Sequence, residues 1–264
     1  GENNSQRSVS SGDGVYRSRD GGKSWENVGL KESEHIGNIV IDPRDSNVVY
    51  VAAQGPLWRS GGDRGLYKTT NGGESWDRIL QVSDDTGVNE VHMDPRNPDV
   101  LYASTYQRRR HVWTLINGGP EGAVYKSEDA GATWRKLKSG LPKGDLGRIG
   151  MCVSPVNPDV VYAIIEGQDE KASGVYRSED RGETWKKRSG YVSNSPQYYN
   201  EIVCHPADVD TVVSLDTFMH ITDDGGKSFK RAPRENRHVA YHALWINPRN
   251  TDHMLVGSDG GIYE

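Results

Sequence analysis

The chain of 264 residues contains one octapeptide five times, at residues 18–25, 69–76, 127–134, 178–185 and 222–229. Its shared pattern is Ser/Thr-x-Asp/Asn-x-Gly-x-Ser/Thr-aromatic. The acidic or amide side chain at the third position can accept hydrogen bonds from the backbone N–H groups that follow, and the glycine allows a positive φ. Each octapeptide is therefore predicted to form a tight hairpin turn, in which the structural acceptors are Asp20, Asn71, Asp129, Asp180 and Asp224.

A second mark alternates with the octapeptide, a proline turn that contains Pro43, Pro95, Pro155, Pro206 or Pro248. Between the marks lie short runs rich in β-branched and aromatic residues, such as 88–94, 100–105, 123–127 and 133–137, without helical periodicity. Four such strands that recur roughly every 40–50 residues are typical of a β-propeller blade. We expect an all-β propeller of four-stranded antiparallel blades, with the octapeptide between the third and fourth strands. Four blades are complete, and the terminal strands could complete a fifth.

The first strand of each blade is expected to be covered on both faces and so to lose its polar alternation. The runs at residues 39–41, 202–203 and 244–246 have this apolar character. The proline turns and the octapeptides are expected at one face of the propeller, which we interpret as scaffold.

The octapeptides resemble the Asp-box, or BNR, repeats of sialidases, xyloglucan-active glycoside hydrolases, sortilin-type receptors and photosystem assembly propellers. Stretches at residues 12–17, 35–40, 106–110, 141–149 and 242–248 are similar to bacterial glycosyl hydrolase/sortilin-like (VPS10-type) repeat proteins. The resemblance covers nearly the whole chain. It implies the propeller fold and an extracytoplasmic location, but propellers host unrelated functions, so it leaves the activity open.

We expect residues 1–264 to form a single propeller domain or a fragment of a larger propeller, because the ends fall within incomplete blades; the fragment is the favoured interpretation. Lys and Arg number 32 against 37 Asp and Glu, which gives a formal charge of −5. This balance argues against a nucleic-acid partner, which calls for a basic face. The absence of a long apolar run argues against membrane insertion.

A ligand is expected at the face opposite the scaffold turns, because irregular loops on a rigid frame usually carry binding sites. These loops offer flat aromatic rings for stacking on a sugar or a peptide, and arginines for pairing with carboxylates or phosphates. The predicted ligand-binding residues are Trp58, Arg59, Arg108, Arg109, Arg110, Trp113, Arg148, Tyr198, Tyr199 and His242. The run Arg108–Arg110 could instead be a solvated loop tip that pairs with Glu121 and Asp63.

Catalysis of glycoside hydrolysis needs two carboxylates roughly 5–10 Å apart. The candidates are Glu90, Glu201 and Asp145, of which Glu90 and Glu201 each lie five residues before a unit proline. We favour the alternative that both glutamates only hydrogen-bond to neighbouring blades, as Asn38 could at the same position. The Arg-Ile-Pro motif that opens sialidase domains is absent, and Asp259 only loosely resembles a xyloglucanase catalytic aspartate.

No metal or cofactor is expected. Each octapeptide offers one carboxylate or amide, fewer oxygens than the roughly six to eight that calcium takes. His238 and His242 flank a predicted strand start, where their spacing does not converge on a metal. Cys152 and Cys204 lie three and two residues before their prolines, which places them on opposite faces of equivalent strands. We therefore predict two small buried thiols and no disulfide.

Three functions are consistent with these features. The favoured one is a non-catalytic propeller that binds a glycan or an extended peptide through its variable loops. The second is part of a glycoside hydrolase of the sialidase or xyloglucanase type. The third is an assembly propeller that grips a protein partner through its arginine-rich loop.

Overall fold

The computed structural model describes residues 1–234 and 236–264, and every regular element in this part of the chain is a β-strand. The chain divides into two compact units, which are described separately. Unit 1 comprises residues 1–93 and 97–135, and unit 2 comprises residues 94–96 and 136–264. No helix long and apolar enough to cross a membrane occurs among the described residues.

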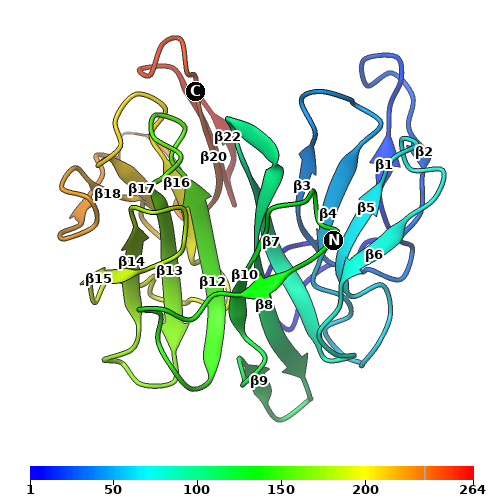
Figure 1. Ribbon diagram of the computed structural model, residues 1–264, viewed down its shortest axis with the longest axis horizontal. Coiled ribbons are helices and arrows are strands. Elements are labelled where there is room, and N and C mark those ends of the chain that lie inside the picture. Colours follow the sequence, from blue (N-terminus) through cyan, green and yellow to red (C-terminus); the bar gives the residue numbers. More distant parts are fainter. Residues whose placement is uncertain (235) are drawn as a thin grey trace. The chain divides into compact units, whose positions relative to one another are not determined.

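Unit 1 contains a two-stranded, a four-stranded and a five-stranded sheet, apart from strand ends that fall in residues 94–96 and 136 (Figure 1). In the four-stranded sheet the strands follow each other in chain order and all pairs are antiparallel. The strands are β1 (Tyr16–Arg17), β2 (Glu26–Asn27), β3 (Ile36–Ile41), β4 (Val49–Ala53), β5 (Gly65–Thr69), β6 (Asp77–Leu80), β7 (Thr86–Asp94), β8 (Asn97–Arg110), β9 (Leu115–Asn117), β10 (Ala123–Ser127) and β11 (Arg135–Lys136).

Unit 2 contains two four-stranded sheets and one three-stranded sheet, each again antiparallel and in chain order. The strands are β12 (Leu146–Val153), β13 (Val161–Gly167), β14 (Gly174–Ser178), β15 (Lys186–Ser189), β16 (Glu201–Cys204), β17 (Val212–Leu215), β18 (His220–Thr222), β19 (Lys230–Arg231), β20 (Tyr241–Ile246), β21 (Met254–Ser258) and β22 (Gly261–Tyr263). The predicted fold class, an all-β propeller of four-stranded blades, is confirmed.

The octapeptides form the predicted turns between the third and fourth strands. In each, the third residue accepts the backbone N–H of the seventh; the Thr133 N–H donates to Asp129 Oδ1 at 2.8 Å, and the Ser75 N–H to Asn71 Oδ1 at 3.0 Å. The serine hydroxyl at the seventh position bonds the same carboxylate, and with the Ser24 N–H it lowers the pKa of Asp20 to about 2. The hydrogen-bonding groups of the third-position side chain are therefore engaged within its own turn.

In the four sheets that carry both marks, the proline turn and the octapeptide lie at the same edge of the sheet, as predicted. The fourth residue of the octapeptide donates its N–H to a carbonyl of the proline turn: Gly72 to Asn47 at 2.9 Å in unit 1, and Gly225 to Asp210 at 3.0 Å in unit 2. This fourth residue has a positive φ in every turn, including Ala130 at 54° and Arg181 at 59°, where no glycine is present.

Apolar side chains fill the space between stacked sheets within each unit. In unit 1 the β3–β6 sheet packs through Tyr50 and Leu66 against Val88 and Val91 of β7. The expectation that first strands are covered on both faces holds for β7 and β12 but is wrong for β3 and β20, because Ile39, Ile41 and Trp245 are about half exposed. That face of β3 is turned toward β1 and β2, which form only a two-stranded sheet.

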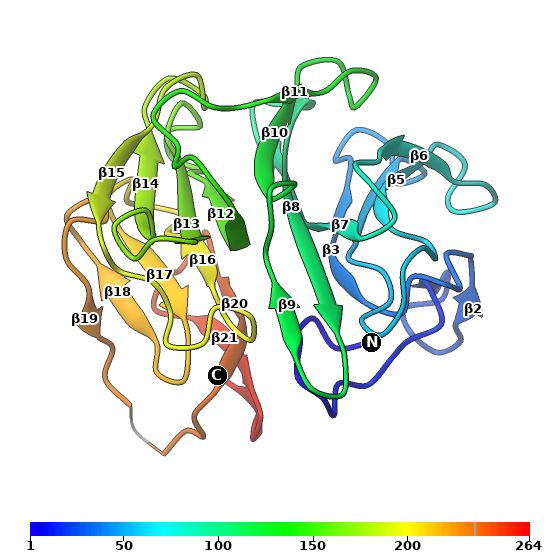
Figure 2. The same cartoon turned by 90° about the horizontal axis from the view of Figure 1, so that it is seen from below.

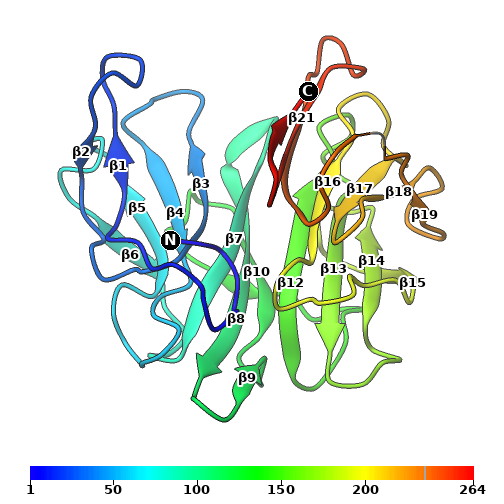
Figure 3. The ribbon, with the colours of Figure 1, turned by 180° about the vertical axis from the view of Figure 1, so that it is seen from behind.

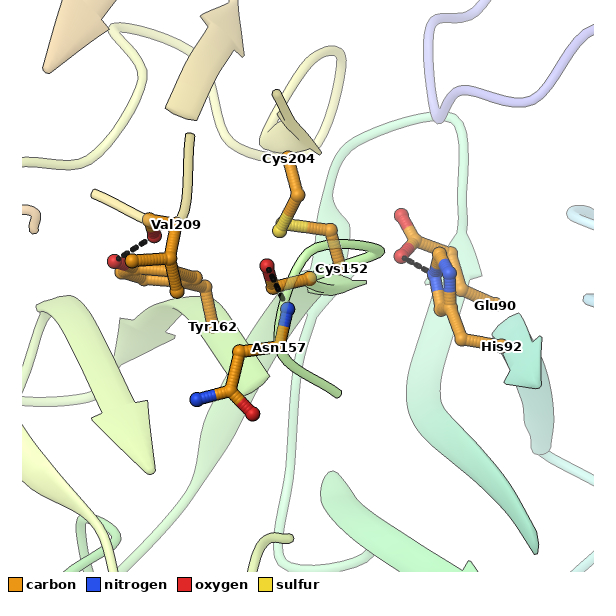
Figure 4. Close-up of a disulfide and its surroundings, with 8 residues drawn as sticks. Glu90, His92, Cys152, Asn157, Tyr162, Cys204 and Val209 are labelled. Atoms are coloured by element: carbon orange, nitrogen blue, oxygen red, sulfur yellow. Dashed lines mark hydrogen bonds and ion pairs between the residues drawn. A yellow bond between two sulfur atoms is a disulfide. The ribbon is translucent and has the colours of Figure 1, made fainter. Parts of the chain in front are cut away.

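Cys152 of β12 and Cys204 of β16 form a disulfide, with Cα atoms 5.7 Å apart, so the prediction of two free thiols is wrong (Figure 4). The prediction failed because the number of residues between a cysteine and its proline shows only which face of its own sheet the cysteine lies on. Neighbouring sheets of a propeller stack face to face, so the residues that meet lie on opposite faces of their own sheets. Both cysteines contact the same inter-sheet core, next to Tyr162 and Val212.

The second strand of the five-stranded sheet is longer than the sequence predicted. The expected strand at residues 100–105 is part of β8, which reaches Arg110 and there pairs with β9 (Figure 2). Arg108 to Arg110 therefore lie on a strand opposite Leu115 to Asn117, and the loop tip is formed by residues 111–114. The interpretation of the arginine run as a loop tip is wrong.

Candidate functional site

Three aromatic rings that the sequence singled out come together in unit 2. Tyr198 and Tyr199 precede β16, and His242 is the second residue of β20. The ring centroids of Tyr198 and His242 are 5.0 Å apart and edge-on, whereas Tyr199 stacks on His242 at 5.4 Å. The two tyrosine rings are 4.7 Å apart. We call Tyr198, Tyr199 and His242 the aromatic cluster.

A carboxylate completes the aromatic cluster on the side of His242. Asp259, in the turn between β21 and β22, places Oδ1 2.9 Å from His242 Nε2. The His242 side chain is 35% exposed and that of Asp259 is 46% exposed, so both polar groups are accessible to a ligand. Burial raises the pKa of Tyr199, which keeps its hydroxyl protonated. The cluster thus combines flat ring faces with hydrogen-bonding groups.

A buried ion pair between Arg148 and Glu201 holds Tyr198 of the aromatic cluster in place. The Arg148 side chain of β12 is inaccessible to solvent and donates from Nη2 to Glu201 Oε1 at 2.6 Å and from Nη1 to the Tyr198 carbonyl at 3.3 Å. Glu201 retains 25% exposure. Because Arg148 is buried, it fixes Tyr198 and Glu201 and does not itself reach a surface ligand, contrary to its predicted role as a ligand contact.

Asn200 fixes the backbone between the tyrosines and Glu201. It is fully buried, has a φ of 68°, and donates from Nδ2 to the carbonyls of Arg148 and Ile164 at 2.8 and 3.3 Å. Left-handed backbone at a residue other than glycine costs free energy and is retained where surrounding contacts impose it. Asparagine tolerates this conformation better than most residues.

The other two catalytic candidates have different surroundings. Glu90 of β7, in unit 1, is 6% exposed and its Oε2 lies 2.9 Å from His92 Nε2. Asp145 precedes β12 in unit 2, and its carbonyl accepts the Gln168 N–H. Glu201 bonds a side chain of the neighbouring sheet through Arg148, which is the arrangement that the non-catalytic interpretation expects. Asn38 makes a comparable contact in unit 1, to the backbone of Val91.

Unit 1 holds the remaining predicted contacts. Trp113, at the β8–β9 hairpin tip, is 81% exposed and stacks on His111, and Trp58 is 44% exposed. Arg59 lies 3.3 Å from Glu34, and Arg109 lies 3.2 Å from Asp85.

The arginine run in unit 1 is directed inward or paired. Arg108 is 1% exposed and donates to backbone carbonyls, and Arg110 Nε donates to the Ser5 carbonyl at 3.0 Å. Glu121 and Asp63, the partners suggested for a solvated tip, instead accept bonds from Ser83 and from the Glu32 N–H. A ligand contact through Arg108 is therefore inconsistent with its burial.

An apolar groove of about 500 Å³ lies in unit 1 beside β1 and β3. It is lined by exposed faces of Tyr16, Trp25, Ile39 and Ile41, and also by Trp76. Two of these residues close octapeptides, a position that the sequence assigned to scaffold. The groove exists because the two-stranded sheet covers less of β3 than a four-stranded sheet covers of β7.

Two contacts of these regions had no signal in the sequence, although Asp259 itself was noted for its loose resemblance to a xyloglucanase aspartate. Asp259 is 17 residues from His242, and only the β20–β21 pairing brings them together. Asn200 is an ordinary residue in the sequence, and its left-handed backbone is visible only in the structure. No group of three or more His, Cys, Asp or Glu side chains is arranged to hold a metal ion within residues 1–234 and 236–264.

Comparisons with known proteins place these features in context. A family model named Sortilin-Vps10 and described as "Sortilin, neurotensin receptor 3" matches residues 13–119 and 122–258. A probable oligoxyloglucan-reducing end-specific xyloglucanase of Neosartorya fischeri is 25% identical, over 95% of this chain and 34% of its own length. The vacuolar protein sorting/targeting protein 10 of Sordaria macrospora is 31% identical, over 38% of this chain and 6% of its own.

Among solved structures, the crystal structure of an ancestral GH74 enzyme is similar in fold. It has a TM-score of 0.68 and 18% identity, and the match covers 95% of this chain and 32% of that one. The chain spans about a third of the length of the xyloglucanase relative.

Proposed function

Because the chain belongs to the Sortilin-Vps10 family, we propose that it is a non-catalytic binding protein whose ligand is a glycan. The observation that carries this proposal is the aromatic cluster of unit 2, with Glu201 and Asp259 beside it. Aromatic faces bind the apolar C–H surface of a sugar ring, and carboxylates accept hydrogen bonds from its hydroxyls. The name of the xyloglucanase relative makes a β-glucan with xylose branches the first ligand to test.

Binding without hydrolysis is supported by the engagement of Glu201. Its carboxylate accepts a 2.6 Å bond from a buried guanidinium, and charge-assisted bonds of this kind hold a carboxylate as an acceptor. A general acid must instead carry a proton near neutral pH. Glu201 is therefore suited to accept hydrogen bonds from the hydroxyl groups of a bound sugar.

We also propose an extracytoplasmic location. The Cys152–Cys204 disulfide supports it, because disulfides form and persist in oxidising compartments and are rare in the cytosol.

The test is a titration of xyloglucan oligosaccharides into the purified chain by calorimetry, preceded by a glycan array. Tyr198→Ala should weaken binding about tenfold, since a lost aromatic contact of about 1.4 kcal/mol corresponds to that factor. Trp245→Ala is the matched control, an aromatic residue of β20 that is 48% exposed and outside the cluster. Equal losses in both variants, or no binding by the unaltered chain, would contradict the proposal.

The alternative is part of a glycoside hydrolase, which the names of the relatives favour. It predicts turnover of labelled xyloglucan oligosaccharides that is abolished by Glu201→Gln, Glu90→Gln or Asp145→Asn. If the unaltered chain hydrolyses the substrate and any of these variants folds but loses that activity, the enzymatic proposal replaces the binding proposal.

A further inference from the structure

Strands β12 and β16 of unit 2 lie side by side but belong to different sheets, so side chains set the distance between them (Figure 3). Two links join them. Near the start of both strands, Arg148 of β12 pairs with Glu201 of β16 at 2.6 Å. Four residues further along β12 and three further along β16, Cys152 is bonded to Cys204. This spacing corresponds to roughly 10–13 Å of extended chain, which is short enough for each strand to move as one piece.

The link at the strand starts holds the aromatic cluster. Arg148 donates to the Tyr198 carbonyl at 3.3 Å, and Asn200 Nδ2 donates to the Arg148 carbonyl at 2.8 Å. Tyr198 and Tyr199 directly precede Asn200 in the chain, whereas His242 comes from β20. The position of β12 relative to β16 therefore determines where the tyrosine rings stand against His242.

Other stacked first strands are held together without a disulfide. Val40 of β3 and Met93 of β7 stand as far from their prolines as the two cysteines do, and both pack against the core of unit 1. Val203 of β16 and Ile246 of β20 occupy the same two positions and pack in the core between their own sheets. Apolar side chains are thus sufficient to stack one blade on the next, so stacking alone does not explain the disulfide.

A close approach of the two backbones does not explain the disulfide either. A Cβ at Gly150 of β12 would collide with the Asn200 carbonyl, and a Cβ at Gly37 of β3 would collide with the Asn89 carbonyl. Strands β3 and β7 therefore approach as closely as β12 and β16 do, with Val40 and Met93 in place of cysteines. The pair β12 and β16 differs in what it carries at its start, which is the support of the aromatic cluster.

We propose that the Cys152–Cys204 disulfide positions the aromatic cluster, so that the ligand is bound tightly only by the oxidised chain. This inference rests on the proposed function, because it concerns the affinity of the same site. Two thiols need more room between the strands than one covalent bond, since unbonded atoms keep a separation of about 3.5–4 Å. Reduction therefore moves β12 away from β16 and displaces Tyr198. A binding site tolerates displacements of only about 0.5 Å.

The reductant is a dithiol, and its thiolate attacks the Cys204 sulfur. Cys204 is partly exposed, whereas Cys152 is 6% exposed. The attack forms a mixed disulfide with Cys204 and releases Cys152, and the second thiol of the reductant then closes a disulfide with the first and releases Cys204. Two electrons and two protons pass from the dithiol to the cysteine pair. The site is consequently at full affinity in an oxidising compartment and weakened in a reducing one.

The experiment compares the affinity of the full chain in its two redox states. Xyloglucan oligosaccharides are titrated by calorimetry before and after treatment with dithiothreitol, in the absence of urea and with circular dichroism as the check of folding. We expect reduction to weaken binding at least about tenfold and reoxidation to restore it. Cys152→Val combined with Cys204→Met copies Val40 and Met93 of unit 1. This double variant should bind as weakly as the reduced chain and should not respond to dithiothreitol.

A matched control separates positioning from a general loss of stability. Val175 of β14 is 1% exposed and packs in the same core as the two cysteines. Val175→Ala should lower the urea midpoint, because it removes buried methyl groups. It should leave the affinity unchanged, because both links between β12 and β16 remain. A loss of affinity in Val175→Ala as large as that on reduction overturns the inference.

The remaining outcomes separate this inference from the proposed function. Equal affinity of the oxidised and reduced chains overturns the inference and leaves the proposed function standing, and so does tight binding by the double variant. If reduction unfolds the chain, the affinity of the double variant decides. If the oxidised chain binds no oligosaccharide, the proposed function fails and hydrogen exchange tests the positioning by itself. Reduction should then accelerate exchange at residues 198–201 more than in β13 and β14, and unchanged exchange at residues 198–201 refutes it.

Discussion

Removing the Cys152–Cys204 disulfide should destabilise unit 2 by a large and calculable amount. The cysteines are 52 residues apart in the sequence. Closing a loop of that length removes about 14 cal/mol/K of chain entropy from the unfolded state, which corresponds to about 4 kcal/mol at 25 °C. The bond joins the first strands of two stacked sheets, so it restrains their separation directly.

The assay is urea denaturation followed by circular dichroism, with and without dithiothreitol. With a denaturant slope of about 2 kcal/mol/M, a loss of about 4 kcal/mol lowers the midpoint by about 2 M. A variant with both cysteines changed to alanine should match the reduced chain and should not respond to dithiothreitol. The reasoning is refuted if reductant leaves the midpoint of the unaltered chain unchanged. Two thiols titrating in the unfolded, unreduced chain would refute it equally.

Two further predictions concern the octapeptide turns. Ala130→Gly and Arg181→Gly should each raise the free energy of unfolding by about 0.5–1 kcal/mol. The reason is that φ values of 54° and 59° strain a residue with a Cβ, and relief of this strain exceeds the extra entropy that glycine loses on folding. A lower urea midpoint in either variant contradicts this. The hydroxyl of Thr133 and its N–H lower the pKa of Asp129 from 3.8 to about 2, so the stabilisation is complete above pH 4 and is lost as the pH falls through the folded value. Asp129→Asn, which copies Asn71, should therefore show a weaker decline of the urea midpoint between pH 4 and pH 2, and an unchanged decline counts against the linkage.

Local features of the fold could be predicted because they are written in neighbouring residues. The octapeptide closes its own turn, since its acceptor and its donors lie within five residues of each other. The four-stranded sheets follow from the alternation of this turn with the proline turn. Strand pairs joined by such short turns need no long-range information.

Contacts between distant residues could not be predicted in the same way. Arg108 meets Asn4 across 104 residues, and nothing near either residue in the sequence indicates the pairing. The aromatic cluster was predicted residue by residue, because unusual aromatic residues stand out in loops. Its carboxylate partner Asp259 and its strained neighbour Asn200 were missed as contacts, since both depend on how strands of unit 2 pair and stack.

Repeated sheets supply an internal comparison that separates scaffold from function. Ala130 and Arg181 have a positive φ, but so does every residue at the same octapeptide position, so this strain belongs to the turn. Asn200 and Ala240 also have a positive φ, at 68° and 66°, and each lies directly before the first strand of a sheet and close to the aromatic cluster in sequence. Before β3 a positive φ is found at Glu34, at 55°, and before β12 at Gly144, at 93°, each two residues ahead of the strand. A positive φ therefore recurs at the entry to first strands in both units, so this conformation belongs to the blade and does not by itself mark the aromatic cluster. β8 does depart from the repeated pattern, because it has 14 residues where β4, β13 and β17 have between four and seven, and its extra length carries Arg108 and Arg110, which donate to the Asn4 and Ser5 carbonyls.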